Sequence, residues 1–402
     1  MKVLQVNATY GLGSTGTIVR DLKECCEEHG IECYVAYALT DEKVERGYKI
    51  GNWFFNKLHA LLSRIAGKQA YFSYIPTLWF IHYIKKLQPD VVHLHNLHSN
   101  YINLPIFLKY LAKNNVRTII TLHDCWWYTG GCYYYTAAVC SKWLDKCGKC
   151  PKRFFETPAY FIDKSAEILN DKKKYLLAIS RLYFVGVSDW ISNEARKSFL
   201  ASKTIMTIHN GIDLSVFKPT PSDLREKLGL TGKYVILGPA SKWLDPINSV
   251  ALNYFIKVMR DDEVLLLFGT LSSYVNGLSE KVKLYGYTKN RQELAALYSM
   301  ADIFVNVSRE DTLSLINVEA QACGTPIITF DATGPKETVD EENSLSVPVG
   351  NYERLYDCVQ CIRRRAGDGT SSNCREFISQ KFSKTDKFKE YINLYTESYL
   401  NL

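Results

Sequence analysis

The stretch Ala301–Phe330, which reads ADIFVNVSREDTLSLINVEAQACGTPIITF, contains the pattern that decides the fold. Two short apolar runs at residues 303–307 and 327–330 are typical of buried strands, and residues 315–322 between them have the composition of a short helix. The sequence from Cys323 to Pro326 contains glycine and proline, which end helices. The stretch therefore predicts a strand–helix–strand unit of a parallel sheet.

Two carboxylates of this stretch, Asp311 and Glu319, are candidates for ligand binding. Asp311 lies in the turn before the predicted helix, and Glu319 lies within the helix. The carboxyl end of a parallel strand and the amino end of the next helix form the usual ligand edge of such sheets. A carboxylate there can accept two hydrogen bonds from sugar hydroxyls. The alternative is structural: Asp311 stabilises the helix terminus, and Glu319 is solvated.

The length and composition limit the classes of protein. A chain of 402 residues with 47% hydrophobic residues is long enough for two or three domains with cores of their own. It has no uninterrupted apolar run of about 18 residues, so we expect no membrane-spanning helix. The N-terminal sequence has the pattern of a first strand and not of a signal peptide, which predicts a cytoplasmic protein.

The net charge of +7 is a mild excess for a chain of this size. It is too small to indicate a nucleic-acid partner, and it fits either an anionic small molecule or the inner face of the plasma membrane. Residues 53–84 are rich in aromatic side chains and include several Lys and Arg residues. They predict either a pair of amphipathic helices that face the core, or an apolar, basic-edged surface that contacts a bilayer or a lipid-linked acceptor.

A glycine-rich turn follows the first predicted strand, residues 2–7. Gly11 and Gly13 precede a predicted helix at about residues 17–29, a geometry that lets backbone amides approach an anion or a sugar closely. The glycine spacing also matches the dinucleotide-binding pattern. The predicted second strand, residues 32–37, nevertheless ends without the acidic residue that would bind a ribose, so we expect neither a nicotinamide nor a flavin cofactor.

Histidines lie in or after two further predicted strands. His93 and His95 fall inside a strand, so we interpret them as mainly structural. His98 follows in a loop, and His123 and Asp124 end the next strand, where parallel sheets bind ligands. A histidine at such a place can bond a sugar hydroxyl and a backbone group at the same time, because it has two ring nitrogens. His123 is therefore the candidate for a functional histidine.

The chain has 12 cysteines, which we expect to be free thiols or metal ligands rather than disulfides, given the absence of a recognisable secretion signal. Cys132, Cys140, Cys147 and Cys150 cluster in a Cys-rich insertion at about residues 125–150 and include one C-x-x-C pair. They can close a structural, tetrahedral zinc site. The alternatives are a reduced thiol cluster and a disulfide that forms after purification.

The second half of the chain restarts the alternation of strands and helices with a strand at residues 234–237. We therefore expect an α/β fold with two doubly wound, Rossmann-like parallel-sheet domains that face each other across a cleft. The first domain comprises residues 1–212, the second comprises residues 213–380, and a C-terminal helix at residues 381–402 packs back on the first.

Five motifs of the chain, taken together, resemble one large family: residues 11–16, 90–96, 121–124, 209–213 and 310–326. They are similar to the retaining glycosyltransferases of family 4, which have the two-domain B-type architecture, and more narrowly to the colanic acid-type branch that makes capsules and exopolysaccharides. The resemblance covers nearly the whole chain. It implies that the second domain binds a nucleotide-sugar, and that its sugar moves to a hydroxyl of a saccharide or lipid-linked saccharide acceptor on the first domain.

The resemblance also implies roles for single residues. Glu319 matches the acid that bonds the donor ribose, Asp311 matches the first acid of the pair, and His123 matches the histidine that faces the donor sugar. The expected catalytic residues are His123, Asp311 and Lys242. The expected donor-binding residues are Gly13, Ser241, Lys242, Gly269, Asp311, Thr312, Leu313, Ser314, Leu315 and Glu319, and the expected acceptor-binding residues are Gly11, Gly13, His98, His123 and Asp124.

One departure from the family pattern concerns the donor diphosphate. The family places an Arg and then Lys-Gly after the first strand of the second domain, whereas this chain has Lys242 and then Ile247-Asn248. Leaving-group stabilisation should be weaker unless Lys336 or another cation contributes, because a single Lys lacks the planar fork of Arg. No Asp-x-Asp metal motif is evident, so we expect metal-independent transfer in which Lys242 and the amides of residues 312–315 stabilise the diphosphate.

Two other functions stay open at this point. The missing Lys-Gly favours a catalytically weak or silent protein that binds a nucleotide-sugar or a partner transferase. A nucleotide-sugar epimerase of the same architecture would need acids that abstract a proton, and the sequence shows no dedicated pair. Apart from the nucleotide-sugar co-substrate, the only group that we consider as a cofactor is the structural zinc of the cysteine cluster.

Overall fold

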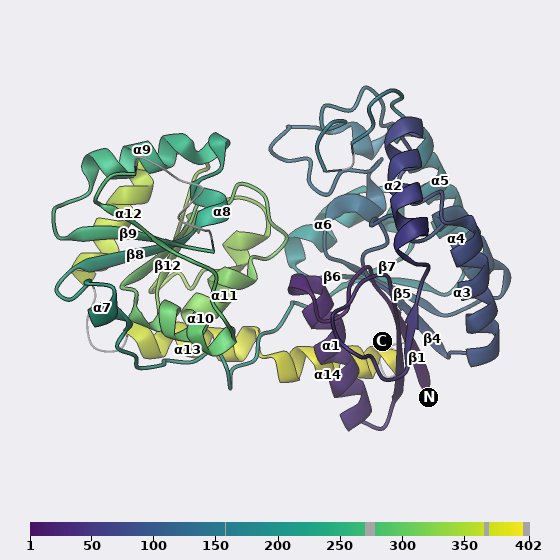
Figure 1. Ribbon diagram of the computed structural model, residues 1–402, viewed down its shortest axis with the longest axis horizontal. Helices are drawn as coiled ribbons and strands as arrows, with labels where there is room; N and C mark the ends of the chain where they lie inside the picture. The colour runs from purple at the N-terminus through teal and green to yellow at the C-terminus, as the bar shows by residue number, and fades with distance from the viewer. Residues whose placement is uncertain (157, 270–277, 366–369, 397–402) are drawn as a thin grey trace. The chain divides into compact units, whose positions relative to one another are not determined.

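The computed structural model describes residues 1–156, 158–269, 278–365 and 370–396 (Figure 1). The chain forms two compact units. The first comprises Met1–His209 together with the C-terminal residues from Phe388 onward, and the second comprises Asn210–Lys387. Each unit contains one parallel sheet with helices packed on it, and each is described by itself.

The first unit has a seven-stranded parallel sheet with the order β3-β2-β1-β4-β5-β6-β7. Its strands are β1 (Lys2–Val6), β2 (Glu32–Tyr37), β3 (Gly47–Lys49), β4 (Val91–Leu94), β5 (Thr118–Leu122), β6 (Leu182–Gly186) and β7 (Thr204–Thr207). Its helices are α1 (Gly13–Glu28), α2 (Trp53–Ala66), α3 (Tyr74–Leu87), α4 (Leu104–Lys113), α5 (Ser165–Leu177) and α6 (Asp189–Lys197), with 3-10 turns η1 (Cys125–Tyr128), η2 (Lys142–Leu144) and η3 (Phe199–Ser202). The strand order reverses between β1 and β4, which is where doubly wound sheets bind ligands.

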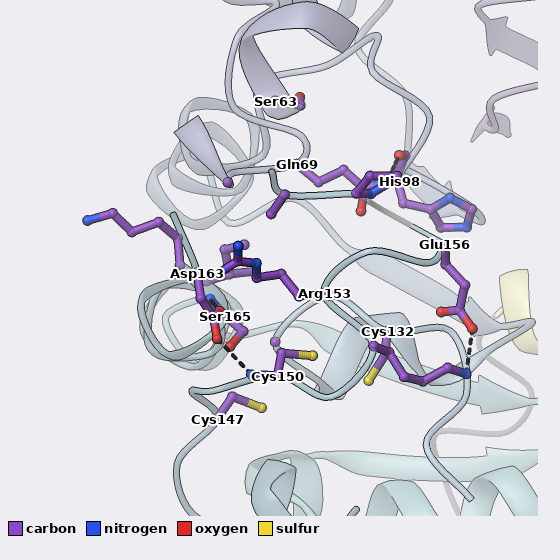
Figure 2. A pocket seen from close by; sticks show the side chains of 18 of the residues that line it. Ser63, Gln69, His98, Cys132, Cys147, Cys150, Arg153, Glu156, Asp163 and Ser165 are labelled. Atoms are coloured by element: carbon purple, nitrogen blue, oxygen red, sulfur yellow. Dashed lines mark hydrogen bonds and ion pairs between the residues drawn. The ribbon is translucent and has the colours of Figure 1, made fainter. Parts of the chain in front are cut away.

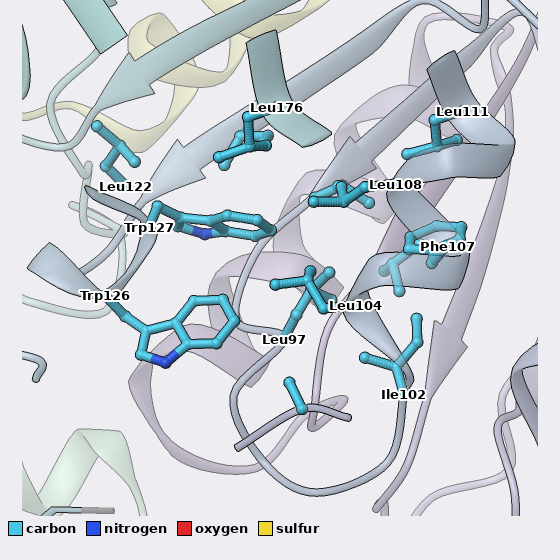
Figure 3. Packing of buried hydrophobic residues seen from close by; sticks show 14 of the residues in the cluster. Leu97, Ile102, Leu104, Phe107, Leu108, Leu111, Leu122, Trp126, Trp127 and Leu176 are labelled. Carbon is cyan, nitrogen blue, oxygen red and sulfur yellow. The ribbon is translucent and has the colours of Figure 1, made fainter. Parts of the chain in front are cut away.

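The core of this unit fixes the course of the chain after β5 (Figure 3). Trp126 and Trp127 in η1 are both buried, and their ring centroids lie 5.2 Å apart. Leu108 of α4 and Leu176 of α5 belong to the same buried cluster. Burial of a side chain of this size contributes about 1.5–3 kcal/mol. The tryptophans therefore anchor the segment that begins with His123.

The second unit has a six-stranded parallel sheet with the order β10-β9-β8-β11-β12-β13. Its strands are β8 (Tyr234–Pro239), β9 (Glu263–Phe268), β10 (Val282–Tyr285), β11 (Ile303–Asn306), β12 (Ile327–Phe330) and β13 (Leu345–Val347). Its helices are α7 (Leu224–Lys227), α8 (Ala240–Trp243), α9 (Ser249–Val258), α10 (Arg291–Met300), α11 (Leu315–Ala322), α12 (Tyr352–Arg365) and α13 (Thr370–Lys381), with 3-10 turns η4 (Pro246–Asn248) and η6 (Gly334–Thr338). α14 (Lys384–Tyr395) begins in this unit and ends in the first.

The stretch 301–330 has the predicted structure. β11 and β12 pair in parallel, with Phe304 opposite Ile327, and α11 covers the residues predicted to be helical. The helix ends before Gly324, whose φ of +86° lies in the left-handed region that glycine adopts without strain. The two parallel α/β sheets confirm the predicted fold class.

The end of α14 packs on β4 and β5. The Tyr395 hydroxyl lies 2.6 Å from Nδ1 of His93, and the Arg117 guanidinium donates to the carbonyls of Leu394 and Tyr395 at 2.6 and 2.7 Å. Arg117 thereby satisfies carbonyls that the end of a helix leaves without partners. The last residues of the predicted C-terminal segment, 397–402, lie outside the described residues.

The aromatic segment forms the two predicted helices, α2 and α3, but α2 does not face the core. Its only buried side chains are His59 and Ser63, whereas Trp53 is 72% exposed and Phe54 is 61% exposed. The interpretation of α2 as a core-facing helix is therefore wrong. The reason is that its outward positions are the apolar ones, so the helix presents its apolar stripe to the surface.

Candidate active site

The glycine-rich turn of the first unit joins β1 to α1. Gly11 and Gly13 have φ values of +73° and +66°, a conformation that other residues rarely adopt. A Cβ atom at Gly11 would lie 2.5 Å from the carboxylate of Glu42, whereas a Cβ atom at Gly13 would have no heavy atom within 4 Å. Gly13 is therefore needed for its backbone conformation, and the space beside it is open to a ligand.

A pair of histidines lies at the carboxyl ends of β4 and β5. Nδ1 of His95 is 2.9 Å from Nε2 of His123, and the rings stack with centroids 5.2 Å apart. Nε2 of His95 is 3.1 Å from Oε1 of Gln5 on β1. Three neighbouring strands thus contribute to one chain of hydrogen bonds, and His95 is a partner of His123 rather than an independent core residue.

Gln5 determines which ring nitrogens of His95 and His123 carry protons. Its Nε2 donates to the carbonyl of Val19 at 3.2 Å, so its Oε1 faces His95 and must accept a proton. His95 therefore carries its proton on Nε2 and accepts at Nδ1, and His123 donates from Nε2. Burial lowers the pKa of His123 to about 4, which keeps the ring neutral near pH 7. Nδ1 is then the acceptor nitrogen of a neutral His123.

His98 and Asp124 form a second polar pair in this unit. Nε2 of His98 donates to Oδ2 of Asp124 at 3.1 Å, and Oδ1 of Asp124 accepts from the amide of Trp126 at 2.8 Å. His98 lines a cavity of about 250 Å³ together with Gln69 and Ser63 (Figure 2). Nδ1 of His98 is buried without a hydrogen-bond partner among the described residues. A ligand hydroxyl could satisfy that nitrogen.

In the second unit, Asp311 organises the turn before α11. Its Oδ1 accepts from the amide of Thr312 at 2.7 Å, and its carboxylate also takes hydrogen bonds from Leu313 and Ser314. Burial raises the pKa of Asp311, and the positive charge of Lys242 opposes that effect. In the described structure the amides of Thr312 and Leu313 therefore serve the Asp311 carboxylate. Lys242 is close enough to interact with the same carboxylate.

Glu319 lies on α11, behind this turn. Its Oε2 accepts from the hydroxyl of Tyr298 at 3.0 Å. Burial raises the pKa of Glu319 to about 7, although the Tyr298 hydrogen bond and the charge of Arg291 act in the opposite direction. A carboxyl with such a pKa can change its charge when a ligand binds.

The other predicted donor residues border the same edge of the sheet. Ser241 follows β8 and is exposed, and Gly269 follows β9 with a φ of +83°. Thr312 and Leu313 are buried, Leu315 is partly buried, and Ser314 has a φ of +70° before α11. Lys336 forms an ion pair with Asp331 at 3.0 Å.

Arg309 is a cation of this edge that the sequence interpretation missed. Its Nε donates to Oδ1 of Asn248 at 3.0 Å, and its Nη2 donates to the hydroxyl of Tyr352 at 2.7 Å. Asn248 is buried and also donates to the carbonyls of Lys242 and Val307 at 3.0 and 3.1 Å. The Asn that stands in place of glycine therefore bonds both the Arg309 guanidinium and the backbone of Lys242. In the sequence, the only signal for Arg309 was its position next to an acidic turn.

Two protein families match this chain. Residues 15–216 match the family described as "Glycosyltransferase Family 4", and residues 250–364 match the one described as "Glycosyl transferases group 1". WcaC of Escherichia coli, named as a colanic acid biosynthesis glycosyl transferase, is 24% identical over 353 residues, which are 85% of this chain and 79% of that protein. A GDP-mannose-dependent monoacylated alpha-(1-6)-phosphatidylinositol monomannoside mannosyltransferase of Corynebacterium glutamicum is 28% identical over 194 residues, 42% of this chain and 50% of that protein.

Solved structures share the fold over the full length. Sucrose-phosphate synthase from Thermosynechococcus elongatus superposes with a TM-score of 0.71 at 17% identity, and the match covers 100% of both chains. Anabaena Alr3699/HepE in complex with UDP-glucose superposes with a TM-score of 0.61 at 15% identity, also over 100% of both chains. At these identities the likeness extends to the fold alone.

Proposed function

The chain belongs to glycosyltransferase family 4 and is therefore a retaining, nucleotide-sugar-dependent glycosyltransferase; we propose that it transfers the sugar to a hydroxyl of a lipid-linked saccharide in polysaccharide biosynthesis. The observation that carries the proposal is that, within one family fold, the second unit contains an edge built around Asp311 and Glu319 and the first unit contains an edge built around His123. The acceptor class is the finer part of the proposal, and the following observations support it.

The donor binds at the edge formed by β8, β11 and α11. The ribose hydroxyls donate to the Glu319 carboxylate, which is held by Tyr298. The diphosphate lies near Lys242 and Arg309, whose charges stabilise the leaving group. Asp311 holds the turn through backbone amides and orients the sugar end of the donor.

The reaction retains the configuration of the sugar. The acceptor hydroxyl attacks the anomeric carbon on the face from which the nucleoside diphosphate departs, and the bond from that carbon to the diphosphate oxygen breaks. The hydroxyl proton passes to an oxygen of the departing phosphate. The protein orients the reactants and stabilises developing charge. His123 stays neutral and accepts a sugar hydroxyl proton in a hydrogen bond at Nδ1.

An exposed apolar surface of the first unit supports a lipid-linked acceptor. The apolar surface patch consists of exposed side chains from three segments: Trp53, Phe54, Leu58, Leu61 and Ile65 of α2, Tyr74, Ile75, Leu78 and Trp79 of α3, and Phe154, Phe155, Tyr160, Phe161 and Ile162 of the loop between η2 and α5. The loop joins α2 through the amide of Tyr160, which donates to the carbonyl of Arg64 at 3.0 Å. Exposed aromatic and aliphatic side chains gathered in this way are typical of a membrane-interface helix.

The sequence of α2 and α3 favours an anionic bilayer. From Arg46 to Pro89 the chain contains no Asp or Glu, but it contains Lys49, Lys57, Arg64, Lys85 and Lys86, and also Lys68, which pairs with Glu167. Basic residues beside an apolar helix face are attracted to anionic lipids. Among the described residues, none of the helices has the length and apolar character needed to cross a membrane. We therefore propose contact with one leaflet, on the side where lipid-linked saccharides present their head groups.

Sedimentation with vesicles tests the membrane part of the proposal. The protein should sediment with phosphatidylglycerol-containing vesicles, and the double variant Trp53→Ser, Phe54→Ser should stay in the supernatant. Tyr287→Ser, which removes an equally exposed aromatic residue of the second unit, should bind as the wild type does. Equal sedimentation of all three proteins would exclude the apolar surface patch as the contact.

Transfer assays test the enzymatic part. Wild type, Glu319→Ala, His123→Ala and Lys242→Ala are compared for transfer from a panel of nucleotide-sugars. We expect each substitution to lower kcat/KM by about 10²-fold or more, as is usual for groups that stabilise a transition state. Unchanged rates in all three variants would contradict the assigned site.

A second candidate function is a catalytically silent protein that binds a nucleotide-sugar or a partner transferase. The observation that favours it is Ile247, an exposed apolar residue where the family has a diphosphate-binding lysine. A silent protein would bind donor with Glu319-dependent affinity and would neither transfer nor hydrolyse it.

A further inference from the structure

Four cysteines of the first unit gather around one cavity. Cys132, Cys140, Cys147 and Cys150 all line the cavity of about 250 Å³ that also includes His98. All four are partly buried free thiols. Figure 2 shows Cys132, Cys147 and Cys150 on one side of this pocket, with Ser63 and Gln69 on the other. We propose that these four cysteines bind one zinc ion, which holds the segment between η1 and α5 in its fold.

The segment between η1 and α5 has little secondary structure to stabilise it. Between Tyr128 and Ser165, the described residues contain only the short turn η2 as regular structure. Tyr135 and Trp143 pack with Tyr128 and provide one apolar anchor. A connection of this length without secondary structure is uncommon in a compact domain unless something else holds it. Four thiolates on one metal ion would supply the missing cross-link.

Two of the four sulfur atoms accept hydrogen bonds from backbone amides. The amide of Gly130 bonds the sulfur of Cys147, and the amide of Lys152 bonds the sulfur of Cys150. Donors of this kind remain useful when a thiol loses its proton to a metal, because they then bond a charged sulfur.

Hydrogen bonds fix the turn between Cys147 and Cys150 before any metal ion binds. Nζ of Lys142 donates to the carbonyls of Gly148 and Lys149 at 3.1 and 3.0 Å, and the amide of Cys150 donates to Oδ2 of Asp163 at 2.7 Å. A Cβ atom at Gly130 would lie 2.9 Å from the Cβ of Cys147, so glycine is needed for this close approach. These contacts keep Cys147 and Cys150 on the same wall of the cavity.

A buried lysine balances the charge of such a centre. Zinc with four thiolates has a net charge of −2, since four thiols release four protons to bind one Zn²⁺. Lys172 is fully buried, its Nζ donates to the carbonyls of Trp126 and Thr129, and its charge acts on Cys132 and Cys147. A buried ammonium group is costly without a nearby negative charge. Asp124 already acts on Lys172 as one negative charge, and the thiolates of the zinc centre would add to it.

Binding would draw the sulfur atoms together. Within the described residues, no three of the four sulfur atoms lie within 4.8 Å of one another. Zinc–sulfur bonds of about 2.3 Å require closer spacing, so side-chain rotations toward the centre of the cavity must accompany binding. Tyr133, whose ring lies 4.3 Å from that of His98, belongs to the same segment. Zinc would therefore also order one wall of the predicted acceptor side.

Metal analysis of the full chain, purified with a reductant, tests this inference without reference to activity. We expect about one zinc per chain, as in other four-cysteine sites. Cys147→Ser and Cys150→Ser should each lose most of the metal, whereas Cys25→Ser, at a partly buried thiol on α1, should keep it. Cobalt substitution of the wild type should give the thiolate charge-transfer bands of a tetrahedral site, even if the serine variants fold poorly.

Two further results decide the matter. Removal of zinc should speed tryptic cleavage at Lys149 and Arg153 and leave the binding of nucleotide-sugars by the second unit unchanged. A protein with no stoichiometric metal and no cobalt bands would overturn the inference, as would a mass that shows these cysteines paired in disulfides. Because none of these measurements involves transfer, failure of the zinc site leaves the proposed function untouched, and the converse also holds.

Discussion

Nδ1 of His95 lies 2.9 Å from Nε2 of His123, and Gln5 determines which of the two rings donates the proton. Gln5 accepts from His95, so His95 must accept from His123. The proton that would otherwise sit on either nitrogen of His123 is thereby held on Nε2. A residue on β1 thus sets the tautomer of a ring on the far side of β4.

Substitution of His95 should slow transfer without weakening the binding of the nucleoside diphosphate. His95→Gln removes the ring that orients His123, and we expect kcat to fall by about 10–100-fold, the usual effect of losing a partner that orients a functional group. The dissociation constant of the nucleoside diphosphate without its sugar, measured by calorimetry, should be unchanged because the proposed ribose and diphosphate contacts lie in the other unit. The control is His82→Gln, an exposed histidine of α3. Equal rates for His95→Gln and the control would contradict the positioning role.

The first unit should lose stability in mild acid. Burial lowers the pKa of His123 to about 4 and that of His93 to about 3, from an ordinary value near 6.5. Both histidines have a lower pKa in the folded protein than in the unfolded chain. Their contribution to the free energy of unfolding is therefore present above about pH 6.5 and is lost as pH falls through the folded pKa. For His123 the loss amounts to at most about 3 kcal/mol. The melting temperature of His123→Gln should therefore depend less on pH between 6.5 and 4 than that of the wild type; parallel curves would refute the burial argument.

The sequence predicted the β11–α11–β12 unit because its apolar runs and its Cys-Gly-Thr-Pro break are local signals. It misjudged α2, because the composition of a helix does not say which neighbour covers its apolar side. His95 was interpreted as structural for a similar reason. Its role depends on β1, β4 and β5 being adjacent, and a strand order is not encoded in any single motif.

Glu319 predicts an unusual pH dependence of donor affinity. Burial raises its pKa to about 7, and only the ionised carboxylate can accept two hydrogen bonds from a ribose. Nucleotide-sugar affinity should therefore increase as pH rises through about 7. Glu319→Gln should bind more weakly at pH 8 and show no such dependence, whereas Glu341→Gln, at an exposed position, should behave as the wild type. Affinity that is constant from pH 6 to pH 8 in the wild type would argue against this role.

Glu319 should give the stability a pH dependence opposite to that of His123. The pKa of Glu319 is raised in the folded protein. Its contribution to the free energy of unfolding is therefore present below the unfolded pKa near 4.5 and is lost as pH rises through about 7. Without ligand, Glu319→Gln should therefore melt at a higher temperature than the wild type at pH 8, and the difference should shrink at pH 5. A difference that does not depend on pH would contradict the raised pKa.

Ile247 offers a direct gain-of-function test. Its side chain is 63% exposed, so Ile247→Lys restores the family cation with little loss of packing. We expect the transfer rate to rise by about tenfold, equivalent to about 1.4 kcal/mol of added transition-state stabilisation. Val250→Lys adds the same charge at a similarly exposed position of α9 and should have no effect. A rise from no measurable activity would instead favour the silent function for the natural chain.

Asn248 is the less suitable position for that test. Its side chain makes three hydrogen bonds inside the unit, so Asn248→Gly should lower the free energy of unfolding by about 1–3 kcal/mol and release Arg309. Arg309→Gln should reduce donor turnover, while Arg354→Gln, at an exposed position of α12, should not. The sequence alone suggested that the diphosphate site had lost a cation, because Arg309, the cation that we propose in its place, lies far along the chain in the segment after β11.

Transfer of radiolabelled sugar into lipid tests the central claim most directly. The full chain is incubated with labelled nucleotide-sugars and with lipid-linked saccharides in anionic vesicles, and label in the lipid fraction is counted for wild type and Glu319→Ala. The account predicts that at least one donor labels the lipid, with the anomeric configuration retained, and that the substitution abolishes labelling. Donor binding without any transfer or hydrolysis by the wild type would contradict it.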